Sequence, residues 1–231
     1  MTAKLAIFDV DGTLVDSRAM ISTAMKEAFT AHGYAAPDYN VTRKIVGLSL
    51  MEAIDKIAPP EANHDDIVAL TEGYKTAFVA LRGNEKIAEP LYDGAKALVL
   101  RLKSNGWKLG IATGKSRRGL DVMMTKHGFV DIFDTTYCAD DGAGKPDPFM
   151  VEANLAELNV RPDRAVMIGD TSFDMIMAVR AGVMAYGVNW GFHTEEEIKA
   201  GGANLIVNDM FELGRALDGF AAMHEFLNPT W

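Results

Sequence analysis

The chain has 231 residues, of which 48% are hydrophobic and 24% charged, and its formal net charge is −9 at pH 7. This length is enough for one large domain or for a core with a smaller domain, and the composition is typical of a soluble globular protein. The acidic balance argues against nucleic acid and anionic membrane surfaces as partners, because both bind basic protein faces.

Neither a membrane-spanning segment nor a secretory leader is predicted. No apolar run reaches the roughly eighteen residues of a transmembrane helix, and Asp9 interrupts the apolar stretch near the N-terminus. The single cysteine, Cys138, has no partner for an intramolecular disulfide, which agrees with a reducing compartment. We therefore expect a cytoplasmic protein, and the sequence leaves both a monomer and a homodimer open.

The first predicted strand covers residues 5–8 and leads directly into two carboxylates. Four consecutive apolar residues are typical of a buried strand, and Asp9 and Asp11 follow it with one residue between them. Side chains alternate along an extended segment, so both acids point the same way, and Gly12 lets the backbone turn close to a ligand. Two carboxylates at this spacing repel each other unless a cation offsets their charge. The stretch therefore predicts a strand that ends in a metal-binding reactive site.

The stretch that follows predicts helices and no strand up to residue 88. Apolar residues recur with helical spacing, and the longer helices are followed by glycine or proline at Gly33, Pro59 and Gly83. The predicted helices cover residues 17–32, 41–46, 49–58 and 63–81. We interpret residues 17–84 as an all-helical insertion, with candidate hinges near residues 16–17 and 84–90.

From residue 90 onward, predicted helices and strands alternate. The strands cover residues 107–112, 135–138, 165–169 and 183–188, and a last strand begins at 205. The helices cover residues 94–103, 116–127 and 172–181, another begins at Asp147 as N-cap with Pro148 as its first residue, one begins at 194, and the last ends at 217. Such alternation predicts an α/β fold with a Rossmann-like, mostly parallel sheet and helices on both faces. We expect this core to comprise residues 1–16 and 85–231, with residues 17–84 as a helical cap domain.

Polar groups follow the ends of the predicted strands, where open parallel sheets bind their ligands. Thr113 and Gly114 follow the second strand and offer a hydroxyl and a free amide at a helix start, which suits a phosphate oxygen. Lys145 lies in a proline-rich turn after the third strand, and Asp170 and Asp174 follow the fourth. Capping of a helix explains one of these two acids but not both. We expect all of these groups to join the N-terminal carboxylate pair in one site.

The segment Asp9-Val10-Asp11-Gly12-Thr13 matches the DxDGT signature of the haloacid dehalogenase-like hydrolase superfamily. The strand-end groups follow in the order of that superfamily's four motifs, so the chain resembles it from residue 5 to about residue 190. The resemblance implies a phosphatase in which Asp9 is the nucleophile and forms an aspartyl-phosphate, while Asp11 is the general acid and base. It further implies that Thr113 and Gly114 hold the transferring phosphoryl group.

The implied cofactor is Mg²⁺. A phosphate monoester dianion repels an attacking carboxylate, so the site has to supply positive charge, which the ammonium of Lys145 and a Mg²⁺ ion on Asp9 and Asp170 would provide. The resemblance adds the main-chain carbonyl of Asp11 and the carboxylate of Asp174 to the metal site. The expected catalytic residues are therefore Asp9, Asp11, Thr113 and Lys145, and the expected metal ligands are Asp9, Asp11, Asp170 and Asp174.

The helical insertion resembles the C1 cap of phosphoglycolate phosphatase-like members of the superfamily. Residues 42–49 resemble the loop of that cap that recognises the substrate, in which Gly47 permits a close approach and Arg43 would bind a second anionic group. A solvated helix face also explains Arg43, and Lys115 either steers an anionic substrate or belongs to the surface. The resemblance implies a small phosphorylated metabolite, similar to phosphoglycolate, as the substrate.

Other activities of the superfamily fit the chain less well. Asp11 opposes a haloacid dehalogenase and a phosphonoacetaldehyde hydrolase, because both lack this acid. β-Phosphoglucomutase-like members carry a histidine shortly after it, where this chain has Met20-Ile21-Ser22. A phosphoryl-transferring sugar-phosphate mutase and a pyrophosphatase remain alternatives. A receiver-like phosphoacceptor module is opposed by the helical insertion and by an acid that hastens breakdown of the phosphoenzyme.

Overall fold

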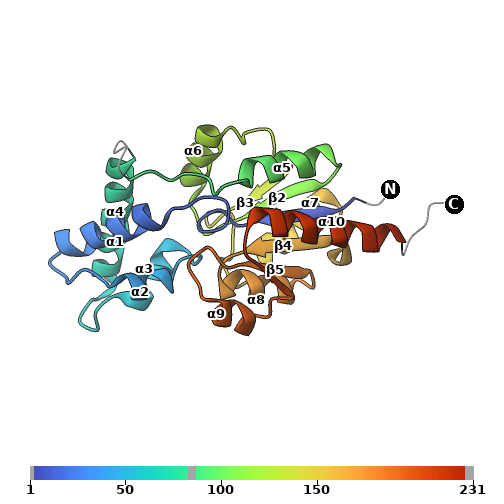
Figure 1. The fold of residues 1–231 in the computed structure, drawn as a ribbon. Helices are drawn as coiled ribbons and strands as arrows, with labels where there is room; N and C mark the ends of the chain where they lie inside the picture. The colour runs from blue at the N-terminus through green and yellow to red at the C-terminus, as the bar shows by residue number, and fades with distance from the viewer. Residues whose placement is uncertain (1–2, 83–86, 227–231) are drawn as a thin grey trace.

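The structure is a computed structural model that describes residues 3–82 and 87–226 (Figure 1). Within these residues, six strands form one parallel sheet in the order β3-β2-β1-β4-β5-β6, so β1 and β4 are its two central strands. The strands are β1 (Leu5–Phe8), β2 (Lys108–Ala112), β3 (Thr135–Tyr137), β4 (Ala165–Gly169), β5 (Met184–Val188) and β6 (Leu205–Val207). The predicted α/β fold with a parallel sheet is confirmed.

Helices cover both faces of the sheet because the side chains of each strand alternate. Ala6 and Phe8 of β1 point to the face covered by α5 (Ala95–Ser104), α6 (Arg117–His127) and α10 (Met210–Phe226). Leu5 and Ile7 point to the opposite face, which is covered by α7 (Phe149–Leu158), α8 (Ser172–Arg180) and α9 (Glu195–Ala200). Since both faces are buried, β1 is apolar throughout, and its first polar side chain appears only where the strand ends.

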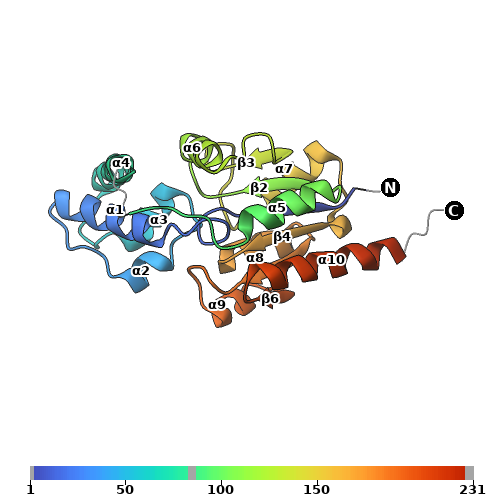
Figure 2. The same cartoon turned by 45° about the horizontal axis from the view of Figure 1, so that its top comes forward.

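The helices α1 (Arg18–Ala31), α2 (Tyr39–Arg43), α3 (Leu50–Ile57) and α4 (His64–Leu81) lie beside the sheet, beyond the end of β1 (Figures 1 and 2). They form the helical insertion, in which α1 packs against α4 and buries Met25, Phe29 and Leu70. The prediction of helices without a strand between residues 17 and 88 is confirmed for the described residues. The predicted helix stop at Gly83 lies outside them.

Two chain segments connect the helical insertion to the sheet and lie side by side. Asp16 donates its backbone N–H to the carbonyl of Pro90 at 2.8 Å, and Tyr92 donates to the carbonyl of Leu14 at 3.0 Å. The predicted hinge at residues 16–17 therefore pairs with the chain that returns from the insertion, whereas residues 84–86 of the other predicted hinge lie outside the described residues. The division into a core of 1–16 and 85–231 and a cap of 17–84 stays our interpretation.

Local capping explains why two helices begin at residues other than the predicted ones. The predicted helix over 41–46 is in fact α2, which begins at Tyr39 because the side chain of Asp38 accepts a hydrogen bond from Asn40 N at 2.7 Å. The helix predicted to begin at Pro148 begins at Phe149, and Asp147 accepts a hydrogen bond from its N–H at 2.9 Å. A short polar side chain thus shifts each helix start by one or two residues.

The last helix, α10, is longer than its predicted end at residue 217. Its extension packs on the sheet, because the ring of Phe220 lies 6.0 Å from that of Trp107, at the start of β2. This contact joins residues that are far apart in the sequence, and helical spacing alone does not show it. No helix of the described chain is both long and apolar enough to cross a membrane.

Candidate active site

Polar side chains that follow different strands meet at the carboxyl edge of the sheet. The Nζ atom of Lys145, in the loop before α7, lies 2.8 Å from Oδ1 of Asp9 and 2.6 Å from Oδ1 of Asp174. All three side chains are buried. Burial alone would lower the pKa of Lys145, but the attraction of Asp174 and Asp9 together raises it above its ordinary value. The two acidic partners thus favour the charged form of Lys145, which lies against the carboxylate that follows β1.

A third buried acid, Asp170, lies beside the two that pair with Lys145. Asp9, Asp170 and Asp174 each offer a carboxylate oxygen, and these oxygens lie within 4.8 Å of one another. Burial raises the pKa of Asp9 to about 7, and burial and the neighbouring carboxylates raise that of Asp170 well above its ordinary value. The negative charge of the cluster is thus only partly compensated. Oxygen ligands of this kind bind hard divalent cations, and a cation such as Mg²⁺ fits the residues present.

The carboxylate of Asp170 is held in one orientation by its neighbours. Its two oxygens accept hydrogen bonds from Thr13 Oγ1 at 2.9 Å and from Phe192 N at 2.8 Å. Gly12 and Gly191 approach so closely that a Cβ atom on either residue would overlap with the carboxylate. Gly12 has a φ of +82°, which favours glycine. The glycine of the N-terminal motif therefore makes room for an acid that follows β4.

The two carboxylate oxygens of Asp174 have different partners. Oδ2 accepts hydrogen bonds from the backbone N–H and the hydroxyl of Thr171, at 3.0 and 2.7 Å, and so caps the start of α8. Oδ1 faces Lys145. One side chain thus combines the capping role with a place in the acidic cluster, and the cap fixes the direction of the oxygen that faces the cluster.

Asp11 lies beside this cluster in an ion pair that the sequence did not predict. Lys115 Nζ lies 2.8 Å from Oδ1 of Asp11 and 3.6 Å from Oε1 of Glu89. Burial opposes the charge of Lys115, but Asp11 and Glu89 outweigh it and raise the pKa of the lysine above its ordinary value. Lys115 is therefore not a solvated surface residue. Glu89 belongs to no motif, and no signal in the sequence marks it.

Thr113 and Gly114 lie at the end of β2, against the backbone of the helical insertion. Thr113 is buried, and a Cβ atom on Gly114 would lie 2.7 Å from the carbonyl oxygen of Gly47 and 2.8 Å from that of Leu48. Gly47 has a φ of +101° and lies close to the side chain of Thr171 in the core. The insertion therefore touches the core at Gly47, the residue that the sequence predicted for a close approach.

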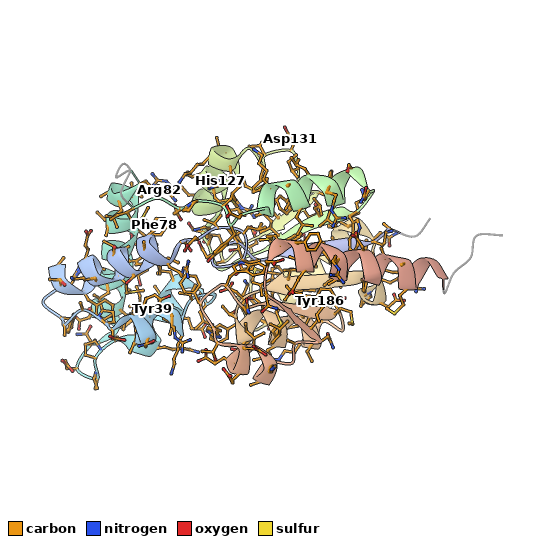
Figure 3. All side chains as sticks on the ribbon, in the orientation of Figure 1. Tyr39, Phe78, Arg82, His127, Asp131 and Tyr186 are labelled. Atoms are coloured by element: carbon orange, nitrogen blue, oxygen red, sulfur yellow. The ribbon has the colours of Figure 1, made fainter. Side chains whose placement is uncertain are left out.

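A cavity of about 380 Å³ lies between the core and the helical insertion. Its polar floor is formed by the core, and its walls come from the insertion and are mainly apolar. Phe78 and Arg82 lie at the end of α4 that faces α6 (Figure 3), and both line the cavity. The floor comprises Asp9, Asp11, Thr113, Gly114 and Lys115. The predicted catalytic and phosphoryl-binding residues therefore surround one space, with Lys145 directly behind Asp9.

Arg43 points away from this cavity. Its Nη1 atom donates hydrogen bonds to Oε2 of Glu197 at 2.7 Å and to the carbonyl of Phe192 at 3.1 Å. The hydrogen bond from Arg43 lowers the pKa of Glu197 to about 2. Among the described residues, Gly47 lines the cavity and Arg43 does not. Arg43 thus links α2 to α9 in this structure, and its predicted binding of substrate stays a prediction.

Comparison with known proteins places the chain in a family. Residues 6–188 match the haloacid dehalogenase-like hydrolase family. The chain is 30% identical over 214 residues to the probable phosphatase IndB of Dickeya dadantii, covering 90% of this chain and 91% of that protein. It is also 30% identical over 217 residues to a phosphoglycolate phosphatase of Rhodospirillum rubrum, covering 91% of this chain and 89% of that one.

A solved structure agrees with these relatives. The crystal structure of a protein described as a predicted phosphatase, from Clostridium acetobutylicum, superimposes with a TM-score of 0.82 at 27% identity, covering 94% of this chain and 99% of that chain. The family match includes β2 to β5, β1 without its first residue, and the acidic cluster at the strand ends. The chain therefore belongs to the haloacid dehalogenase-like hydrolase family, in the part of it that resembles phosphoglycolate phosphatases.

Proposed function

We propose that the chain is a Mg²⁺-dependent phosphatase that hydrolyses a small phosphorylated metabolite through an aspartyl-phosphate on Asp9. The observation that carries this proposal is the buried cluster of Asp9, Asp170 and Asp174, in which Lys145 pairs with Asp9 and Asp174, and Asp9 reaches the floor of the cavity. Positive charge next to a buried carboxylate lets that carboxylate approach an anionic phosphate ester. The names of the relatives support a phosphatase and make phosphoglycolate the first substrate to test.

The residues of the chain divide the reaction into two displacements. Asp9 attacks phosphorus, so that an Asp9 Oδ–P bond forms as the bond to the leaving oxygen breaks, and Asp11 donates a proton to that oxygen. A water molecule then gives its proton to Asp11 and attacks phosphorus, which releases inorganic phosphate and restores Asp9. Lys145 offsets the negative charge of the phosphoryl oxygens. The amide N–H of Gly114 and the hydroxyl of Thr113 donate hydrogen bonds to these oxygens and hold them in place.

The metal would lie on the carboxylates of Asp9, Asp170 and Asp174 and on the main-chain carbonyl of Asp11. When bound, it supplies positive charge that lowers the repulsion between the ester and the nucleophile. The hydrogen bonds from Thr13 and Phe192 orient Asp170 for this role. The net charge of −9 supports a soluble metabolite rather than nucleic acid as substrate, and we further infer a cytoplasmic enzyme that is a monomer or a homodimer.

Metal removal provides the first test. Purified protein should release phosphate from phosphoglycolate or a related monoester with Mg²⁺, and EDTA should lower the rate at least about a hundredfold. Because the acidic cluster carries uncompensated charge, Mg²⁺ should also raise the temperature of unfolding, which is measured without any substrate. Equal rates with Mg²⁺ and EDTA would contradict the metal role. A requirement for a sugar bisphosphate would favour the mutase, and a preference for pyrophosphate the pyrophosphatase.

Replacing Gly114 by alanine should lower kcat/KM at least about tenfold, because a shift of about an ångström between the catalytic groups and the substrate lowers the rate strongly. The new Cβ atom would lie 2.7 Å from the Gly47 carbonyl oxygen, which is too close for the helical insertion to keep its position. Steady-state kinetics measure the effect. In Gly219→Ala, the control on α10, no atom comes within 4 Å of the new Cβ, and activity should not change. Full activity of the Gly114 variant would show that this contact is not needed for turnover.

A further inference from the structure

We infer that the substrate is a phosphate monoester whose leaving group is larger and more apolar than glycolate. The inference rests on the proposed function and names the part of the substrate that the acidic cluster does not recognise. It comes from the walls of the cavity, which the phosphate itself would not reach. Phosphate occupies the floor at Asp9, so the leaving group has to extend toward the helical insertion.

The walls that the insertion contributes are mainly apolar. Side chains come from α1, from the loop before α3, from α3 and from α4, and all but a few of them are apolar; the charged ones are Lys75 on α4 and Arg82 at its C-terminal end. The uncharged ones include Ile21, Val46, Leu48, Tyr74, Phe78 and Val79. The rings of Tyr74 and Phe78 lie 5.7 Å apart and tilted by 37°, which forms a broad aromatic surface. Such an aromatic and aliphatic surface binds hydrocarbon better than it binds a carboxylate.

The cationic side chains that line the cavity are Lys75, Arg82, Lys115 and Arg118, and Arg118 belongs to α6 of the core rather than to the wall that the insertion contributes. Lys115 is occupied by Asp11 and Glu89, and Arg43, the predicted partner of a second anionic group, is paired with Glu197. Lys75 is paired with Glu72 on the surface of α4. Arg82 lies with its guanidinium 5.3 Å from the ring centre of Phe78, where it extends the flat wall.

The size of the cavity supports the same conclusion. Cavities of about 300–1,000 Å³ enclose ligands of drug size, and this one measures about 380 Å³. Glycolate adds only a two-carbon acid to the phosphate and would leave most of the apolar wall in contact with water. A chain or ring of six carbon atoms would cover that wall, and the affinity would grow with the apolar area removed from water.

A series of ethyl, butyl and hexyl phosphates tests this inference beside phosphoglycolate. The three alcohols have closely similar acidity, so the chemical step stays constant while the apolar area grows. We expect kcat/KM to rise about threefold to fourfold per added methylene, the factor that corresponds to about 0.8 kcal/mol for each buried CH₂ group. Hexyl phosphate should also exceed phosphoglycolate. A flat series with phosphoglycolate as the best substrate would confirm the phosphatase and overturn the apolar leaving group.

Wall variants separate binding of the leaving group from catalysis. Phe78→Ala should lower kcat/KM for hexyl phosphate about thirtyfold and that for ethyl phosphate less than about threefold. Val79 and Val68 form a matched pair, since both are exposed on α4 and only Val79 lines the cavity. Val79→Ser should lower the rate with hexyl phosphate about fivefold, and Val68→Ser should leave it unchanged. If Phe78→Ala and Val79→Ser each lower the rates with hexyl and ethyl phosphate by the same factor, the inference is overturned.

Binding of alkylphosphonates, which the enzyme cannot hydrolyse, distinguishes failure of this inference from failure of the proposed function. In calorimetry with Mg²⁺, hexylphosphonate should bind at least about eightyfold more tightly than ethylphosphonate, because it has four more methylenes, and Phe78→Ala should reduce this preference at least about tenfold. If no ester is hydrolysed but this preference holds, the proposed phosphatase fails and the apolar binding site stands. If esters are hydrolysed but the two phosphonates bind equally, the phosphatase stands and the apolar site fails.

Discussion

Replacing Asp9 by asparagine should reduce phosphate release by a factor on the order of 10⁴ or more, because the amide lacks the anionic oxygen that attacks phosphorus. No neighbouring acid can take over this attack. Asp11 is paired with Lys115, and the oxygens of Asp170 accept hydrogen bonds from Thr13 and Phe192. Phosphate release and single-turnover trapping of the phosphoenzyme measure the loss.

Asp218→Asn is the matched control for this variant. The carboxylate of Asp218 pairs with Arg101 at the surface of α10 and lies outside the cavity, so its loss should leave the rate unchanged. If Asp9→Asn keeps more than about a tenth of the activity, the nucleophile is another group and the aspartyl-phosphate mechanism is wrong.

The stability of the Asp9→Asn variant shows whether its loss of activity comes from the missing nucleophile or from unfolding. Burial raises the pKa of Asp9 from 3.8 to about 7. A raised pKa means that the folded protein binds this proton more tightly than the unfolded chain. The free energy of unfolding of the metal-free protein therefore falls as the pH rises from about 4 to about 7, and the contribution of this proton is lost above that range. Asparagine has no such proton, so the free energy of unfolding of the variant should not show this part of the decrease with pH.

Urea denaturation in EDTA at pH 5 and pH 8 measures this difference. The free energy of unfolding of Asp9→Asn minus that of the wild type should rise from pH 5 to pH 8. At pH 8 the variant should be at least as stable as the wild type. A variant that unfolds more easily at both pH values would have lost its structure as well as its nucleophile, and its inactivity would then carry no mechanistic meaning.

Replacing Lys145 by methionine should abolish activity and lower the free energy of unfolding in EDTA by about 3–5 kcal/mol, the cost of removing one partner from a buried ion pair. Methionine fills a similar volume, so the loss comes from the charge. Without the ammonium, Asp9 and Asp174 face each other and Asp170 with no cation between them. Urea denaturation and phosphate release measure the two effects.

Two further variants test whether the charge is responsible. Lys199→Met removes a lysine that pairs with Glu195 but has a 63% exposed side chain, and it should cost less than about 1 kcal/mol. Combining Lys145→Met with Asp9→Asn should cost less stability than Lys145→Met alone, because one of the repelling acids is gone. If Lys145→Met unfolds at the wild-type urea concentration, the lysine is not the cation that holds the acidic cluster together.

The strands and the polar groups that follow them could be predicted because their signals are local. Four apolar residues before Asp9 indicate a buried strand whatever the rest of the chain does, and the alternation of strands and helices leads to a parallel sheet. Parallel strands place their carboxyl ends at one edge, so Lys145 and Asp170 were expected near Asp9 without any knowledge of their distances. The bounds of α2 and α7 depended on single capping contacts and were predicted less well.

The sequence by itself determined the sheet, the helical insertion and the residues that meet at the strand ends, since each depends on spacing along a short stretch of chain. The tertiary structure alone decided the partners of those residues. Lys115 pairs with Glu89 and Asp11, and Arg43 pairs with Glu197 rather than lining the cavity. These contacts join segments that are distant in the sequence: the contacts of Lys115 form within the core, and that of Arg43 depends on the packing of the insertion on the core. The same packing forms the apolar wall of the cavity, because a hydrophobic residue on a helix has no assigned neighbour until the helix is docked.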